Sequence, residues 1–188
     1  MPILKKETDV FPADLLENSE LLEDDTRHWW ALYTMSRQEK ELMRRLVKQQ
    51  IAFFAPVIPR EYRSPAGRLR TSYIPLFSNY VFINGSDEDR YNAVSTGCVS
   101  RCLEVTEGEQ LAADLRRVKL LINGGTDLTP EAKILPGDFV RVRSGSMEGL
   151  IGTVVERRGE KRLLVAVNFL QQGASIELRD VDVEPYTP

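Results

Sequence analysis

Two cysteines and one histidine are the side chains most suited to metal or nucleophilic chemistry. Cys98 and Cys102 lie four positions apart, and His28 is the sole histidine of the 188 residues. A structural zinc site usually takes four Cys or His ligands, so these three do not supply one. The thiols could form a bridge or stay reduced, and we favour two reduced, partly buried thiols in a reducing compartment. We expect no metal and no cofactor.

Motifs for catalysis are missing from the sequence. It has no Gly-Lys-Ser/Thr phosphate loop and no second histidine for a metal pair. His28 precedes a predicted strand and has no convincing Ser or Cys partner. The many carboxylates fall mostly in loops and polar faces, where solvation explains them. The sequence therefore predicts a binding protein and not an enzyme.

Charge is distributed unevenly along the chain. Residues 1–26 hold two basic and eight acidic side chains, residues 27–122 hold fifteen and ten, and residues 123–188 hold eight and ten. A net charge of +5 between flanks of −6 and −2 indicates a local patch for a polyanion, although solvated surface charge would give the same numbers. Apolar runs such as Leu163–Val167 are too short to span a bilayer. No secretory signal is visible, and we expect a cytoplasmic, monomeric protein.

The middle of the chain has the pattern of a mixed α+β domain. Residues 29–34, 80–83 and 99–105 are rich in β-forming types, and residues 53–59 are predicted to form a strand interrupted by proline. Ser36 and Glu39 form a capping-box pattern before a helix that ends near Gln50. Helices are also predicted at 87–95 and 110–121. Residues 60–71 are predicted to form a hairpin with its tip at residues 64–67.

The remaining segments divide the chain into parts. Residues 1–26 predict a loosely ordered acidic arm, with a short helix around 13–22. Residues 27–122 form the α+β domain, and the turn-rich residues 123–134 form a linker. Residues 135–188 contain five short predicted strands and no helix, which is typical of a small β-barrel. These strands are predicted at 140–142, 152–156, 163–167, 175–178 and 181–184.

The most specific motif opens this last segment. Leu135-Pro136-Gly137-Asp138-Phe139-Val140-Arg141-Val142 is followed by Gly145 and by residues 147–156, which include Gly152 and Val154. The glycines allow positive φ or a close backbone approach. These residues resemble the KOW motif of the NusG family of transcription factors. The resemblance implies a five-stranded SH3-like barrel.

The first domain resembles the same family independently. Trp29-Trp30-Ala31-Leu32-Tyr33, Phe54-Ala55-Pro56 and residues 75–82 look like the NusG N-terminal domain. Residues 76–82 resemble the specialised RfaH branch more than housekeeping NusG. Ser78 departs from the usual proline, and housekeeping members have Gly at the position of Asn79. The implied function is transcription elongation and antitermination.

The resemblance implies a binding site for the clamp helices of the largest RNA polymerase subunit. The matching positions are Tyr33, Phe77, Tyr80 and Phe82. Tyr80 and Phe82 share one face of a strand, so this pair can form an aromatic surface. The alternative is that these rings belong to the domain core.

The resemblance also implies contact with upstream or non-template DNA. Phosphate-binding candidates on the basic helix and hairpin are Arg44, Arg45, Lys48, Arg60, Arg63, Arg68 and Arg70. A solvated charged surface is the alternative. Met35, Glu41 and Gly97 depart from the base-reading residues of RfaH, while Arg45 and Thr96 stay possible contacts. We therefore expect a different DNA element, if any.

Barrels of this type dock a ribosomal protein or Rho in the family. Met147, Leu150, Phe169 and Leu170 are the candidates for an exposed apolar edge. Ile74 replaces the glutamate that pairs the two domains in RfaH-like proteins, and the last strands alternate well, so we expect a permanent barrel. Two alternative functions are a ribosome-associated RNA-binding KOW protein and a structural scaffold. Copurification with polymerase or with ribosomes would separate them.

Overall fold

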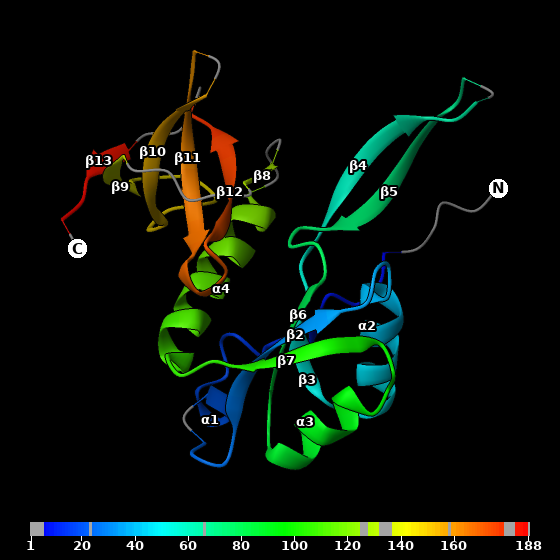
Figure 1. Ribbon diagram of the computed structural model, residues 1–188. Coiled ribbons are helices and arrows are strands. Elements are labelled where there is room, and N and C mark those ends of the chain that lie inside the picture. The colour runs from blue at the N-terminus through cyan, green and yellow to red at the C-terminus, as the bar shows by residue number, and fades with distance from the viewer. Residues whose placement is uncertain are drawn as a thin grey trace. The chain divides into compact units, whose positions relative to one another are not determined.

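The computed structural model describes residues 6–22, 24–65, 67–124, 128–131, 137–157, 159–178 and 183–187. The chain divides into two compact units, Met1–Gly108 and Glu109–Pro188. All recorded strand pairs in both units are antiparallel, and the helices are few, in agreement with the predicted α+β class (Figure 1). None of the helices in the described ranges is long and apolar enough to cross a bilayer.

The first unit is built on a five-stranded antiparallel sheet in the order β1-β3-β6-β2-β7. Its strands are β1 (Val10–Phe11), β2 (His28–Thr34), β3 (Ala52–Phe54), β6 (Tyr80–Gly85) and β7 (Val99–Glu104). Its helices are α1 (Ser19–Leu22), α2 (Glu39–Lys48) and α3 (Asp87–Val94). The strand at 29–34, the helix at 36–50 and the helix at 87–95 are thus present within one to three residues of their predicted bounds.

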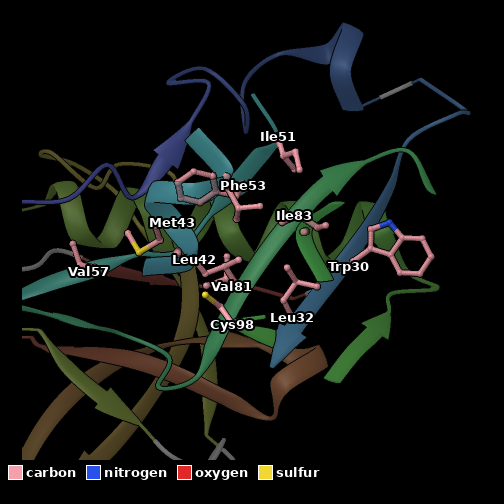
Figure 2. Packing of buried hydrophobic residues seen from close by; sticks show 13 residues of the cluster. Trp30, Leu32, Leu42, Met43, Ile51, Phe53, Val57, Val81, Ile83 and Cys98 are labelled. Atoms are coloured by element: carbon pink, nitrogen blue, oxygen red, sulfur yellow. The ribbon is translucent and has the colours of Figure 1, made fainter. Parts of the chain in front are cut away.

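One face of this sheet forms the main core with α2 and α3. Leu42 and Met43 of α2 lie in one buried cluster with Leu32 of β2 and with Val81 and Ile83 of β6, as Figure 2 shows. Side chains alternate across a strand, so the neighbours of these residues point to the opposite face. That opposite face therefore carries the predicted aromatic residues of β2 and β6.

Helix α2 begins differently from the prediction. Its N-cap is Gln38, without a side-chain cap, so Ser36 and Glu39 do not form a capping box. The Glu39 carboxylate instead accepts a hydrogen bond from the Asn79 N–H at 2.9 Å. A tertiary partner has replaced the local one. The capping box of this unit lies on α3, between Ser86 and Asp89.

The acidic arm is part of the fold. Strand β1 pairs with β3, and Leu15 and Leu16 are fully buried. The expectation of a loosely ordered arm is therefore wrong for the described residues 6–22. The helix of the arm is only one turn long, at Ser19–Leu22. Two buried leucines and a two-residue strand hold this segment in place, although its acidic composition alone predicted a loosely ordered arm.

A separate two-stranded sheet follows β3. Strands β4 (Val57–Arg63) and β5 (Leu69–Pro75) form an antiparallel hairpin, as predicted. Val57 and Ile58 are buried at its base, whereas both strands are exposed towards the tip. Gly67 has φ +74° in the turn, a conformation that favours glycine. The hairpin extends away from the five-stranded sheet (Figure 1).

The second unit contains a six-stranded antiparallel sheet in the order β13-β9-β10-β11-β12-β8. Its elements are α4 (Gly108–Asn123), β8 (Thr129–Glu131), β9 (Asp138–Val142), β10 (Ile151–Arg157), β11 (Glu160–Val167), the 3-10 turn η1 (Asn168–Leu170), β12 (Gln172–Glu177) and β13 (Val183–Pro185). The five predicted strands correspond to β9–β13, although residues 181 and 182 lie outside the described residues. Strand β8 arises from the predicted linker because it pairs with β12.

Helix α4 lies in the second unit from Glu109 onwards. The sequence placed it in the N-terminal domain, with a boundary at residue 122, whereas the structure divides the chain at Gly108. Its buried residues Leu111, Leu115, Val118 and Leu121 form one apolar stripe at helical spacing. The predicted period was correct, but a period does not specify the surface against which a helix packs.

Candidate functional surfaces

The four residues predicted to bind polymerase form two ring pairs. Tyr33 of β2 and Tyr80 of β6 are register partners, with ring centroids 5.2 Å apart at 73°. Phe77 and Phe82 meet edge to face at 6.3 Å and 84°. Tyr80 and Phe82 lie on the same strand face, so the two pairs are adjacent. The structure thus brings all four predicted residues together on the sheet face opposite α2 and α3.

The two pairs differ in exposure. Phe77 and Phe82 are buried, whereas Tyr33 and Tyr80 are half-buried. Only the tyrosines can therefore offer ring area and a hydroxyl to a partner in this conformation. The two phenylalanines are buried, so the alternative assignment to the domain core holds for them.

The loop that leads into β6 is held by backbone contacts. Asn79 has φ +66°, its carbonyl accepts from the Thr34 N–H at 2.8 Å, and its own N–H donates to Glu39. Asparagine and glycine tolerate this left-handed conformation best. The positive φ at position 79 explains why asparagine stands here and why the resemblance leads one to expect glycine as the other residue at this position. The loop fixes the start of β6 and with it Tyr80.

The basic face of α2 is paired with carboxylates. Glu41 accepts hydrogen bonds from Arg44 at 2.8 Å and from Arg45 at 2.8 Å, and Arg44 also contacts Glu7 of the arm at 2.7 Å. The hydrogen bond from Arg44 and the hydrogen bond from Arg45 are the two largest causes that lower the pKa of Glu41 to about 2, so this carboxylate stays ionised at neutral pH. Arg45 also donates to the Thr96 carbonyl at 2.7 Å. The positive charge of α2 is therefore partly neutralised, although the candidate Lys48 is exposed.

The four predicted arginines of the hairpin do not share one face. Tyr62 lies opposite Arg70, and Arg60 lies opposite Ser72. Arg63 lies opposite Leu69 and therefore points to the other face. Arg68 precedes β5 near the turn, where its N–H lies 3.3 Å from Ser64 Oγ. The structure thus groups Arg60 and Arg70 around an exposed tyrosine and separates Arg63 from them.

The predicted apolar edge of the second unit is wrong for two of its four residues. Met147 and Leu150 are buried, while Phe169 is 38% exposed and Leu170 is half-buried. The loop folds back on itself, since the Gly149 N–H donates to the Val142 carbonyl at 2.9 Å and the Val142 N–H donates to the Leu150 carbonyl at 2.9 Å. Met147 also lies against Gly124, the residue that follows α4. A Cβ atom added at Gly124 would stand 2.7 Å from the Cγ of Met147. Apolar side chains in a loop became core because the loop closes over the sheet.

One buried carboxylate was missed by the sequence reasoning. Asp114 of α4 accepts hydrogen bonds from the Asn168 N–H at 2.9 Å and from Asn168 Nδ2 at 3.3 Å. Its other oxygen accepts from Gln110 at 2.8 Å and from Arg117 at 3.0 Å. Burial raises the pKa of Asp114 against these bonds. The sequence feature that could have indicated this buried carboxylate is the position of Asp114 within the apolar stripe of the helix predicted at 110–121.

The cysteines and carboxylates do not assemble into a recognisable reactive centre in the part of the chain that the structure describes. Cys98 is buried, Cys102 is half-buried and both are unbridged, as favoured from the sequence. Burial raises the pKa of the Cys102 thiol. Across the described ranges, no group of three or more His, Cys, Asp or Glu side chains could hold a metal ion.

Comparison with known proteins gives one family match. Residues 27–118 match the model of the NusG family, described as transcription termination factor nusG. The match supports the family resemblance of this segment and ends within α4. No curated protein matches the chain.

Proposed function

Starting from a NusG domain at residues 27–118, we propose that this chain is a NusG-type transcription elongation and antitermination factor of the RfaH-like branch. Its first unit binds the clamp helices of RNA polymerase through Tyr33 and Tyr80. Its second unit is a KOW domain that recruits a further partner, such as a ribosomal protein or Rho. The protein works by binding and not by catalysis.

The observation that carries this proposal is the aromatic surface on the sheet face away from the helices. Tyr33 and Tyr80 are half-buried and pack edge to face at 5.2 Å. Two half-buried rings on neighbouring strands, on the same sheet face as the buried Phe82, form an aromatic surface that exists before a partner binds. Aromatic residues of this kind are enriched among the energetic hot spots of protein interfaces.

Replacing Tyr33 and Tyr80 by Ala should weaken binding to core RNA polymerase by about 2–4 kcal/mol, because both would be hot-spot residues. Surface-immobilised polymerase without nucleic acid measures this affinity directly. These two residues are preferable to Phe77, whose burial means that truncation would also destabilise the unit.

Tyr91 provides the matched control, since it is an exposed tyrosine on α3 of the same unit. Tyr91→Ala should bind as the unmodified chain does. Unchanged polymerase affinity of a folded Tyr33→Ala, Tyr80→Ala variant would refute the proposed site. Binding to ribosomal subunits in place of polymerase would favour the ribosome-associated alternative.

A further inference from the structure

The β4–β5 hairpin presents one face that is both basic and aromatic. Tyr62 is 44% exposed and lies directly opposite Arg70. Arg60 precedes Tyr62 by two residues on the same strand, so its side chain points to the same face. We call Arg60, Tyr62 and Arg70 the Tyr62 face. The ring therefore has a cationic side chain across the ladder and another along its own strand.

Core packing does not account for this tyrosine. The buried cluster of the first unit reaches the hairpin only at its base, through Val57 and Tyr73. Beyond the base, residues 59–63 and 67–70 are all exposed. Single exposed aromatic residues are common on protein surfaces, so exposure alone indicates no ligand. The combination with two flanking guanidinium groups is more specific.

The chemistry of this face fits one kind of partner. Guanidinium groups bind phosphates, and an aromatic ring stacks on the face of a nucleobase. In a duplex the base faces are covered by their neighbours, and only the edges are accessible in the grooves. A ring can therefore stack fully on a base only where the strand is unpaired. An apolar protein surface would not complement the two cations.

We propose that Tyr62 is a stacking platform for an unpaired base, with Arg60 and Arg70 on the adjacent phosphates, so that the hairpin binds single-stranded nucleic acid. This inference goes beyond the proposed function, which rests on protein partners, and assigns a base contact to Tyr62. It also excludes Arg63 from the binding face. DNA and RNA share the required chemistry, and separate probes distinguish them.

Fluorescence anisotropy of labelled 20-nucleotide probes tests the proposal with the full chain. The probes are single-stranded DNA of mixed sequence, RNA of the same sequence, and the corresponding DNA duplex. Tyr62→Ala should weaken binding to the single strands about tenfold or more, the usual contribution of one stacked base. Its effect on duplex binding should be less than twofold. Tyr62→Phe keeps the ring and should bind the single strands normally.

Leu69 is the matched control, because it is 63% exposed on the opposite face of the same hairpin. Leu69→Ala should bind single strands as the unmodified chain does. The salt dependence separates stacking from charge: Tyr62→Ala should keep the slope of log K against log salt concentration. Arg70→Gln should reduce that slope by about 0.7, the value for one phosphate contact on a single strand. Arg63→Gln should leave it unchanged.

A direct signature of stacking comes from Tyr62→Trp. The natural residues Trp29 and Trp30 are buried, so the added indole would be the exposed one. Its fluorescence should be quenched by either single strand and not by the duplex. Quenching by both single strands, or by one of them, supports the proposal and identifies its ligand.

Three results would overturn the proposal: no detectable binding of either single strand, a Tyr62→Ala variant with unchanged affinity, or equal losses on single strand and duplex. The polymerase assay contains no nucleic acid and depends on Tyr33 and Tyr80. If the Tyr33 and Tyr80 variants bind polymerase normally while Tyr62→Ala weakens binding to the single strands, only the proposed function is refuted. If the Tyr33 and Tyr80 variants lose polymerase binding while Tyr62→Ala binds the single strands normally, only this inference is refuted.

Discussion

Leu150→Asp should unfold the second unit, whereas Phe169→Asp should leave it folded. Leu150 is 1% exposed, so the substitution removes a packed side chain and buries a carboxylate without a partner. The two effects together should destabilise the unit by about 4 kcal/mol or more. This is comparable with the whole stability of many small domains. Phe169 is 38% exposed and should tolerate the charge.

Heteronuclear NMR of the full chain measures this difference for each unit separately. In Leu150→Asp the amide signals of β10–β12 should lose their dispersion, while those of β2 and β6 should keep it. A dispersed spectrum for β10–β12 in Leu150→Asp would contradict the assignment of this residue to the core. The comparison also directs the search for a partner surface to Phe169, because a Met147 or Leu150 variant would lose binding through unfolding.

The sequence predicted the elements of both units well because their patterns are local. Alternating and aromatic residues marked β2 and β6, and Ser64–Gly67 marked the turn of the hairpin. The aromatic set of Tyr33 and Tyr80 followed from a family resemblance, and the register of β2 and β6 brings the two residues together.

Features that depend on tertiary partners were not predictable in the same way. The stripe of α4 was visible, but its partner was not, because periodicity describes one surface and not the surface that covers it. Met147 and Leu150 seemed exposed since they lie in a loop, and the hydrogen bonds from Gly149 and Val142 that close this loop are not encoded in a local pattern. The pairing of β1 likewise depends on strand β3, which the chain supplies about forty residues later.

Asp114→Ala should destabilise the second unit by about 3 kcal/mol. The carboxylate accepts four hydrogen bonds, and two of them come from Asn168 of η1. Its removal leaves the Asn168 N–H, whose bond to Asp114 is partly buried, without this acceptor and leaves a cavity in the apolar stripe of α4. Urea unfolding followed by the amide signals of β11 and β12 measures the loss. Glu109→Ala, an exposed acid on the same helix, is the matched control and should change stability by less than about 0.5 kcal/mol.

The pH dependence of stability, compared between the unmodified chain and Asp114→Asn, tests the physical cause. Burial raises the pKa of Asp114 in the folded unit above its unfolded value of about 3.9. Between these two values the folded state binds more protons than the unfolded state, so the contribution of this group to stability falls as pH rises. The advantage of the unmodified chain over Asp114→Asn should therefore be larger near pH 4 than at pH 7. Groups such as Glu41, whose pKa is lowered to about 2, act in the opposite direction but cancel in this difference between variants. An advantage that grows towards neutral pH would mean that the hydrogen bonds from Asn168, Gln110 and Arg117 outweigh burial at Asp114.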